Sequence, residues 1–179
     1  MINVRNKLGK NLDIFLSIII IVAVVLITIY VIFSKQQMIA LYILDSDRKT
    51  INYPQVIVLN KNNTILFYIG MENRFWSSKD VILKIIISNN GYKKNITLFQ
   101  QKYHMRSNEK ILLYFNITLA DMSLMNNEIF IPYVLVNGSM HSLNFYLKQG
   151  SFIMINAKLF DAENNFLGQW VSIRIRVKK

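Results

Sequence analysis

The chain contains no cysteine among its 179 residues. Small secreted domains often depend on disulfide bonds, so a domain built from this sequence must be stabilised by its hydrophobic core alone. The composition allows such a core, since 53% of the residues are hydrophobic and eleven are phenylalanine. Covalent cross-linking to a partner through a disulfide is excluded.

Residues that bind metals are also scarce. The only two histidines, His104 and His141, lie on separate predicted elements and have no cysteine neighbour. Metal sites built on nitrogen and sulfur need closely spaced ligands, so no metal site is expected. Residues 45–49 (DSDRK) open like a calcium loop, but a basic pair stands where further oxygen ligands are needed. We interpret this segment as a β-turn.

No pattern of catalytic residues is present. The chain lacks a Gly-x-Ser-x-Gly nucleophile elbow, and no Ser-His-Asp arrangement can be assembled. Glycoside hydrolysis by a pair of carboxylates is an alternative that the sequence leaves undecided. The chain has only 10 acidic residues, however, and most lie near predicted turns. We therefore expect no enzyme, no catalytic residue and no cofactor, with a hydrolase as a distant alternative.

One long run lacks charge, proline and glycine altogether. Residues 14–33 read IFLSIIIIVAVVLITIYVIF, and a helix of this length spans a hydrocarbon core of roughly 30 Å. Lipid offers the backbone no hydrogen-bond partner, so a transmembrane α-helix is predicted. The run has no Gly-x-x-x-Gly pattern and no ionisable side chain, which favours a plain anchor.

The residues before this run predict its orientation. Three are basic and one is acidic: Arg5, Lys7, Lys10 and Asp13. Positive flanks tend to stay in the cytoplasm, and the run is longer than the 7–15 residues typical of a cleaved signal peptide. We expect a cell-membrane protein with four parts: a cytoplasmic tail (1–13), a retained signal anchor (14–33), a tether (34–37) and an extracytoplasmic domain (38–179).

A type IV pilin-like filament subunit is an alternative interpretation. Pilin precursors resemble this chain in having a short basic leader, a glycine and then a hydrophobic helix. Gly9 followed by Lys10 matches loosely, whereas Leu8 stands where archaeal pilins usually carry a basic residue. Asp13 replaces the usual glutamate one position early. This alternative predicts cleavage after Gly9.

The charge balance is basic, with 21 Lys and Arg against 10 Asp and Glu. This balance favours anionic partners such as phospholipid head groups, acidic glycans or an acidic protein. The basic residues are scattered, and no segment shows the basic and aromatic signature of a nucleic-acid module. No nucleic-acid partner is therefore expected.

Beyond the anchor, β-branched and aromatic runs of strand length are separated by turns rich in Asn and Gly. Strands are predicted at residues 64–73, 81–88, 95–101, 110–118, 129–136, 139–147, 152–160 and 166–178. Turns are predicted at residues 89–91, 137–138 and 161–165, and a loop or single helical turn at residues 121–127. About eight to ten strands without a convincing helix predict a mainly β fold, an antiparallel β-sandwich.

Outward-facing residues of the last strand are candidates for partner contacts. Apolar residues alternate there with polar ones, so one face lies in the core and the other in solvent. Trp170 shares the polar face with Arg174 and Arg176, which indicates partial exposure or cover by a loop. Trp76 lies in a polar loop, where an exposed aromatic can anchor a contact, although burial in the core is favoured. We name Trp76, Arg174 and Arg176 as candidate contacts.

Four asparagines stand in N-glycosylation sequons: Asn62, Asn95, Asn116 and Asn137. All four lie in the part expected outside the membrane, where a glycosyltransferase acts. Asn137 falls in a predicted turn and Asn116 alternates with apolar strand residues, so both should face solvent. N-linked glycans are expected at some of these positions.

Residues 40–73, ALYILDSDRKTINYPQVIVLNKNNTILFYIGMEN, resemble an archaeal membrane-anchored family, domain of unknown function 1616. The resemblance rests on the LYIL run, the pair Tyr53-Pro54 and the close of a strand from Gly70 to Asn73. Residues 159–177 are similar to that family's final hairpin. Arg74-Phe75 replaces the family's His-Glu. The resemblance implies an extracytoplasmic, immunoglobulin-like domain and supplies no reaction or catalytic residue.

The sequence thus predicts a single-pass protein with a cytoplasmic N-terminus and a glycosylated β-sandwich at an archaeal cell surface. Its expected role is that of a cell-envelope component or an accessory subunit of a membrane complex. The expected partners are the lipid bilayer and another protein.

Overall fold

The computed structural model describes residues 2–35, 38–49, 55–59, 61, 63–89, 94–148 and 150–178. The chain forms two compact units, divided between Met38 and Ile39. The first unit is helix α1 (Ile2–Lys35), whose segment Ile14–Val31 is long and apolar enough to cross a membrane. The predicted helix is confirmed, and it continues through most of the basic tail. Residues 36–37 of the predicted tether lie outside the described part.

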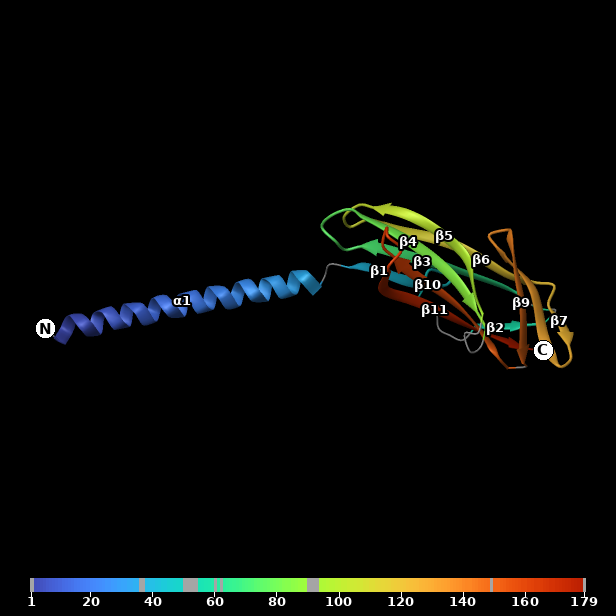
Figure 1. Ribbon diagram of the computed structural model, residues 1–179, viewed down its shortest axis with the longest axis horizontal. Helices are drawn as coiled ribbons and strands as arrows, with labels where there is room; N and C mark the ends of the chain where they lie inside the picture. Colours follow the sequence, from blue (N-terminus) through green and yellow to red (C-terminus); the bar gives the residue numbers. More distant parts are fainter. Residues whose placement is uncertain are drawn as a thin grey trace. The chain divides into compact units, whose positions relative to one another are not determined.

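The second unit is a sandwich of two β-sheets (Figure 1). The first sheet has the order β1-β3-β6-β8, and both β7 and β9 pair with β8. Its strands are β1 (Ile39–Leu44), β3 (Thr64–Asn73), β6 (Lys110–Ala120), β7 (Ser123–Met125), β8 (Glu128–Val136) and β9 (Ser139–Lys148).

The second sheet has the order β2-β11-β10-β4-β5. Its strands are β2 (Gln55–Val58), β4 (Lys79–Ser88), β5 (Asn95–Met105), β10 (Phe152–Phe160) and β11 (Phe166–Lys178). Adjacent strands are antiparallel, except that β2 runs parallel to β11. The predicted β-sandwich is therefore confirmed, with one parallel pair that makes the second sheet mixed.

Two predicted turns are confirmed by their backbone geometry. Asn137 and Gly138 have φ values of 48° and 88°, the positive values that a two-residue hairpin turn needs. At residues 161–165, the backbone N–H of Asn165 donates to Asp161 Oδ1 over 2.7 Å. The predicted turn at 45–49 is confirmed in the same way, by N–H donors to Asp45 Oδ1. Part of the predicted turn at 89–91 lies outside the described residues.

The prediction of a loop or helical turn at residues 121–127 is wrong. This segment contains strand β7, which pairs antiparallel with the start of β8. Asn126 and Asn127 make the connecting turn with φ values of 50° and 64°. Asparagine tolerates this left-handed conformation better than most residues, so the hairpin forms there without glycine.

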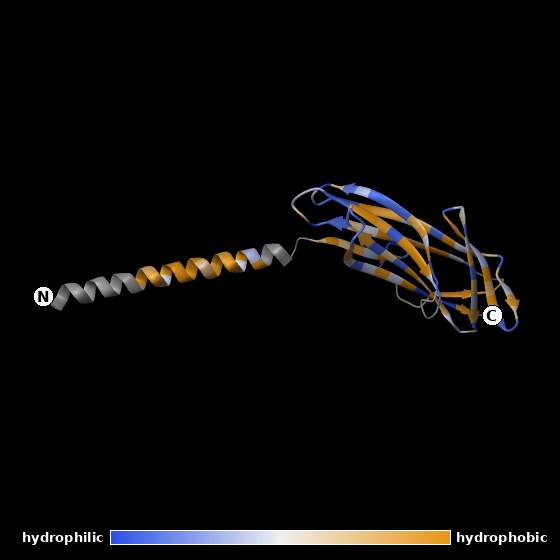
Figure 2. Ribbon diagram, viewed as in Figure 1, coloured by the Kyte–Doolittle hydropathy of each residue, from blue (hydrophilic) through white to orange (hydrophobic). Residues whose placement is uncertain are grey.

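The core lies between the two sheets and is built from alternate residues of each strand. Along β4, for example, Val81, Leu83, Ile85 and Ile87 are buried. Phe67 and Phe115 stack in the core with ring centres 5.7 Å apart. Figure 2 shows this alternation as orange and blue along the strands, and a largely orange middle of α1. Burial of this apolar surface is the main stabilising term in a chain without disulfides.

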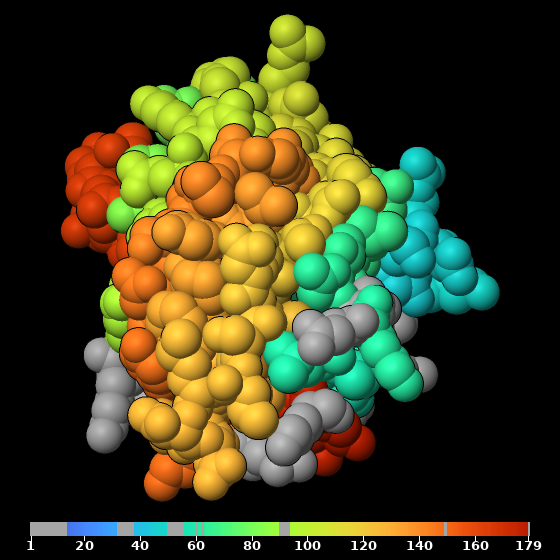
Figure 3. All heavy atoms as spheres, turned by 90° about the vertical axis from the view of Figure 1, so that its right-hand side faces the viewer, coloured from blue at the N-terminus to red at the C-terminus, as the bar shows by residue number. Residues whose placement is uncertain are grey.

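Strand β9 lies at one edge of the first sheet, beside β8. The gold and orange atoms in the middle of Figure 3 belong to this part of the chain. Lys94, just before β5, donates from Nζ to the carbonyl of Leu143 in β9 over 2.7 Å. This hydrogen bond ties the edges of the two sheets together. The outer face of the second sheet, which points away from the core, carries the candidate residues Asn95, Arg174 and Arg176.

Candidate functional site

The outer face of the second sheet is assembled by strand register from four strands. Neighbouring outward residues form rows across β5, β4, β10 and β11. From one end the rows are Asn95–Ser88–Met154–Arg174, Thr97–Ile86–Asn156–Ser172, Gln100–Lys84–Lys158–Trp170 and Lys102–Ile82–Phe160–Phe166. The alternation predicted for the last strand is confirmed, because Ile173, Ile175 and Val177 are buried while Arg174 and Arg176 are exposed.

A hollow of about 260 Å³ opens on this outer face. We call it the sheet-face hollow, and it is lined by Ile86, Asn95, Asn156, Lys158, Phe166 and Trp170. Asn156 is only 6% exposed, whereas the rings of Trp170 and Phe166 remain 55% and 48% exposed. The hollow therefore combines a nearly buried amide, that of Asn156, with two exposed aromatic side chains. The sequence predicted either partial exposure of Trp170 or cover by a loop, and the structure shows partial exposure.

The outer face of the second sheet is strongly basic. Its outward cations are Lys84, Lys102, Lys158, Arg174, Arg176 and Lys178, and Asp80 is the only acidic residue among the outward positions of these four strands. Three of the cations lie over neighbouring rings: Arg174 is 4.5 Å from the centre of Phe152, Lys84 is 4.6 Å from that of Phe160, and Lys158 is 5.8 Å from that of Phe166. Such cation–π contacts hold the side chains over the face.

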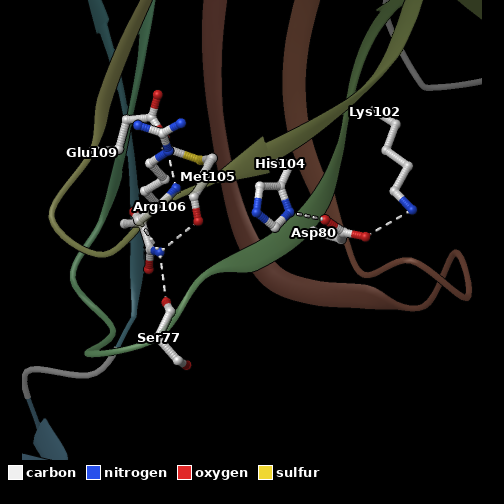
Figure 4. A network of polar contacts seen from close by, with 8 residues as sticks. Ser77, Asp80, Lys102, His104, Met105, Arg106 and Glu109 are labelled. Atoms are coloured by element: carbon white, nitrogen blue, oxygen red, sulfur yellow. Dashed lines mark hydrogen bonds and ion pairs between the residues drawn. The ribbon is translucent and has the colours of Figure 1, made fainter.

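Asp80 contacts two neighbours from β5, Lys102 and His104, at the end of this face (Figure 4). Its carboxylate oxygens lie 2.7 Å from His104 Nδ1 and 2.9 Å from Lys102 Nζ. The hydrogen bond from Lys102, followed by that from His104, holds the pKa of the Asp80 carboxyl below its usual value. All three side chains are accessible to solvent, so we interpret them as a surface ion-pair cluster.

The geometry of this cluster does not assemble a hydrolytic site. An activated nucleophile needs a hydroxyl or thiol within hydrogen-bond reach of the base, and none bonds to His104 in the described part of the chain. His141 lies on β9, opposite Val134, and so stays apart from His104, as the sequence predicted. Across the described ranges, no group of three His, Cys, Asp or Glu side chains is arranged to hold a metal.

Trp76 is at the surface, so the favoured expectation that it fills the core is wrong. Its side chain is 68% exposed, in the loop between β3 and β4. The buried amide of Asn73 occupies the base of that loop and donates to the carbonyls of Ser77, Met105 and Arg106 over 2.9–3.1 Å. Asn73 Oδ1 also accepts the N–H of Phe75. These bonds fix the loop, which leaves Trp76 exposed as a possible contact residue.

The sequons differ in how well they present their asparagine. Asn95 is exposed at the start of β5, on the rim of the sheet-face hollow, whereas Asn62 lies outside the described residues. Asn137 is exposed as predicted, but its Nδ2 donates to the carbonyl of Tyr114 and its Oδ1 accepts the N–H of Asn116. Asn116 was expected to face solvent and is only partly exposed. Asn95 is the best-presented sequon of the described three.

The first sheet has an outer face of different character. Tyr68 and Tyr114 lie with ring centres 5.3 Å apart, and Leu66, Leu112 and Tyr114 are exposed around them. This face is aromatic and apolar where the other is basic. Sequence patterns did not reveal it, because its residues come from β3 and β6 and meet only through the register of those strands.

No family model and no curated protein matches the chain. Among solved structures, the chain is similar to the β-glucosidase from Listeria innocua in complex with glucose, with a TM-score of 0.47 and 7% identity over 79% of this chain. It covers only 16% of that enzyme. The CARDB domain of the PF1109 protein from Pyrococcus furiosus, in complex with di-metal ions, gives a TM-score of 0.42 and 14% identity over 78% of this chain and 87% of that domain.

The N-terminal domain of PorA gives a TM-score of 0.31 and 9% identity over 78% of this chain and 98% of that domain. These likenesses are too distant to carry an activity, a metal or a partner to this chain. Its class rests on its own elements, a β-sandwich domain joined to one long apolar helix.

Proposed function

We propose that this chain is a non-catalytic, single-pass membrane protein whose β-sandwich lies outside the cytoplasm and binds a partner there. The partner is expected in the cell envelope or in a membrane complex that the chain serves as an accessory subunit. The observation that carries the proposal is the segment Ile14–Val31, which has a mean hydropathy of 3.2 and no part buried against protein.

A bilayer is the environment that suits this segment. Fully burying one large aliphatic side chain is worth about 1.5–3 kcal/mol relative to leaving it in water, and every residue from 14 to 31 is exposed. Helical geometry also satisfies the backbone hydrogen bonds within the segment, as lipid requires. The basic residues Arg5, Lys7 and Lys10 support a cytoplasmic N-terminus.

Surface features of the sandwich support a binding role. It presents an exposed tryptophan on the rigid loop after β3, a basic face with a hollow on the second sheet, and an aromatic face on the first sheet. Aromatic and cationic side chains of this kind are enriched among residues that contribute most to binding. The exposed cluster of Asp80, Lys102 and His104, with no hydroxyl or thiol bonded to His104 among the described residues, supports a non-catalytic role.

The absence of cysteine makes a labelling test of topology straightforward. Ala162→Cys places one thiol in the exposed turn before β11, and Asn6→Cys places one in the basic tail. In intact cells, a membrane-impermeant maleimide should label the first variant and should label the second only after permeabilisation. The cysteine-free parent gives the background. The reverse labelling pattern, or protection of both variants in intact cells, would refute the proposed topology.

The filament-subunit alternative is separated from this proposal by the mass of the native protein. Processing as a pilin predicts a mature chain that begins after Gly9, whereas a signal anchor keeps the basic tail. Mass spectrometry of protein purified from its own membranes distinguishes the two. A mature N-terminus at Lys10 would replace the anchor proposal with the filament alternative.

A further inference from the structure

We propose that the sheet-face hollow binds an acidic saccharide, with the sugar ring against Trp170 and Phe166 and its carboxylate beside Lys158. This inference deepens the proposed function by naming a ligand class for the binding domain. The inference rests on the proposed function only for where the ligand is found, outside the cytoplasm. The hollow itself is part of the folded sandwich and does not depend on the anchor.

The floor of the hollow carries a polar group without a partner. Asn156 is 94% buried on the outward side of β10, and its amide makes no hydrogen bond among the residues that the structure describes. Buried amides almost always have partners, yet this side chain lines the hollow and stays accessible from it. An amide has both donor and acceptor atoms, which suits the hydroxyl groups of a sugar.

A second polar group near the hollow is also unsatisfied. The hydroxyl of Ser88 is fully buried and has no hydrogen-bond partner within the described ranges. Ser88 lies opposite Asn95 in the pairing of β4 with β5, and the exposed Asn95 lines the hollow. Ser88 itself does not line the hollow, so Asn95 and Asn156 supply its uncharged polar groups.

The other side of the hollow is aromatic. Trp170 and Phe166 both lie on β11, and both residues are about half exposed. The C–H face of a pyranose ring is apolar and slightly positive, and the face of an aromatic ring is negative. A sugar stacked on these rings would direct its hydroxyl groups toward the Asn156 amide. The hollow thus matches the two-sided character of a sugar.

The charge of the hollow selects an acidic ligand. Lys158 lies opposite Trp170 in the strand register, with its Nζ 5.8 Å from the centre of the Phe166 ring. It takes part in none of the ion pairs found in the described part of the chain, and none of the lining residues is acidic. A ligand carboxylate would supply the missing counter-charge.

A saccharide carboxylate fits the lining better than a phosphate group does. Phosphate sites typically use the paired donors of arginine or a cradle of backbone N–H groups. No arginine lines the hollow, and the nearby Arg174 stacks on Phe152. Its floor is a strand whose backbone groups are engaged in pairing with β4 and β11. We therefore favour the acidic sugar, and the test includes a phosphate ligand.

The test uses the full chain in mild detergent, produced in a bacterial host without N-glycosylation, so that Asn95 is unmodified. Trp76→Phe leaves Trp170 as the only tryptophan, and its fluorescence reports directly on the hollow. The titrants are digalacturonate and sialyllactose, with lactose as the neutral control and glycerol 1-phosphate as the soluble phosphate control. At least one acidic saccharide should give a saturable change and bind at least tenfold more tightly than lactose.

Three variants in the Trp76→Phe background assign the contacts. Lys158→Gln should weaken binding of the acidic saccharide at least tenfold, whereas Lys102→Gln, a cation of the same face that does not line the hollow, should change it less than twofold. Calorimetry with Trp170→Ala should show no saccharide binding, and circular dichroism should show that each variant is folded.

The proposal is overturned if neither acidic saccharide gives a saturable signal, or if glycerol 1-phosphate binds with at least equal affinity. It is also overturned if Lys158→Gln binds the saccharide as tightly as the parent does. None of these outcomes depends on membrane topology, which the maleimide labelling tests independently. Failure of the saccharide site would therefore leave the anchored binding domain standing.

Discussion

The buried amide of Asn73 should be a major determinant of the stability of the sandwich. This side chain, fully buried at the end of β3, makes four hydrogen bonds: three to carbonyls of the neighbouring loop and strand, and one from the N–H of Phe75. Asn73→Ala removes all four. The exposed Ser78 of the same loop has no such contacts and provides the matched control, Ser78→Ala.

The expected loss can be worked out from these bonds. A typical hydrogen bond contributes about 0.5–1.5 kcal/mol net, and a buried acceptor left unsatisfied costs about 1–3 kcal/mol. The bond to the carbonyl of Met105 is fully buried, and those to Ser77, Arg106 and Phe75 are partly buried. Since water can reach the partly buried groups, we expect a total loss of about 3 kcal/mol, with less than about 0.5 kcal/mol for Ser78→Ala.

Urea unfolding of the full chain in detergent, followed by tryptophan fluorescence, measures this loss by linear extrapolation. Asn73→Ala should also speed proteolysis of the loop that carries Trp76, because its hydrogen bonds to the loop are gone. A destabilisation below about 1 kcal/mol, or one equal to that of Ser78→Ala, would refute the reasoning from buried hydrogen bonds.

Three further predictions concern single residues of the sandwich. The lowered pKa of Asp80 means that its contribution to stability is present at neutral pH and is lost as the pH falls below the usual aspartate value of about 3.9. Asp80→Asn should therefore reduce the difference in urea midpoint between pH 7 and pH 3, and an unchanged difference would contradict this. In a glycosylating host, glycopeptide mapping should find Asn95 more occupied than Asn137, whose Nδ2 is already hydrogen-bonded; equal occupancy would count against it. A Cβ at Gly70 would overlap the far end of the Tyr42 ring, so Gly70→Ala must displace that ring and should cost up to about 1 kcal/mol. The cost should vanish in a Tyr42→Ala background, and urea unfolding of the four variants measures it; an equal cost in both backgrounds would contradict the proposed overlap.

Much of the fold follows from local patterns in the sequence. The strands at 64–73, 152–160 and 166–178 have the predicted bounds, because period-two alternation and Asn-containing turns act over a few residues. Strand β7 could not be found in this way, since it has three residues and its turn contains no glycine. The parallel pairing of β2 with β11 joins segments more than a hundred residues apart in the sequence, and no local pattern encodes it.

The candidate site was predictable only in part, for the same reason. Alternation along one strand placed Arg174 and Arg176 on the outside. The sheet-face hollow, however, combines residues from Ile86 to Trp170 on four strands, and it exists only through their register. The exposure of Trp76 likewise depends on the bonds that Asn73 makes to residues more than thirty positions away.

The central claim, a sandwich held outside the cytoplasm by one apolar helix, is tested most directly by protease protection. Sealed inside-out membrane vesicles, prepared from cells that express the chain with an N-terminal epitope, are treated with proteinase K before and after detergent is added. The epitope should be lost at once, while a fragment containing the anchor and the sandwich stays intact until detergent is added. Digestion of the sandwich in sealed vesicles, with the epitope protected, would contradict the account.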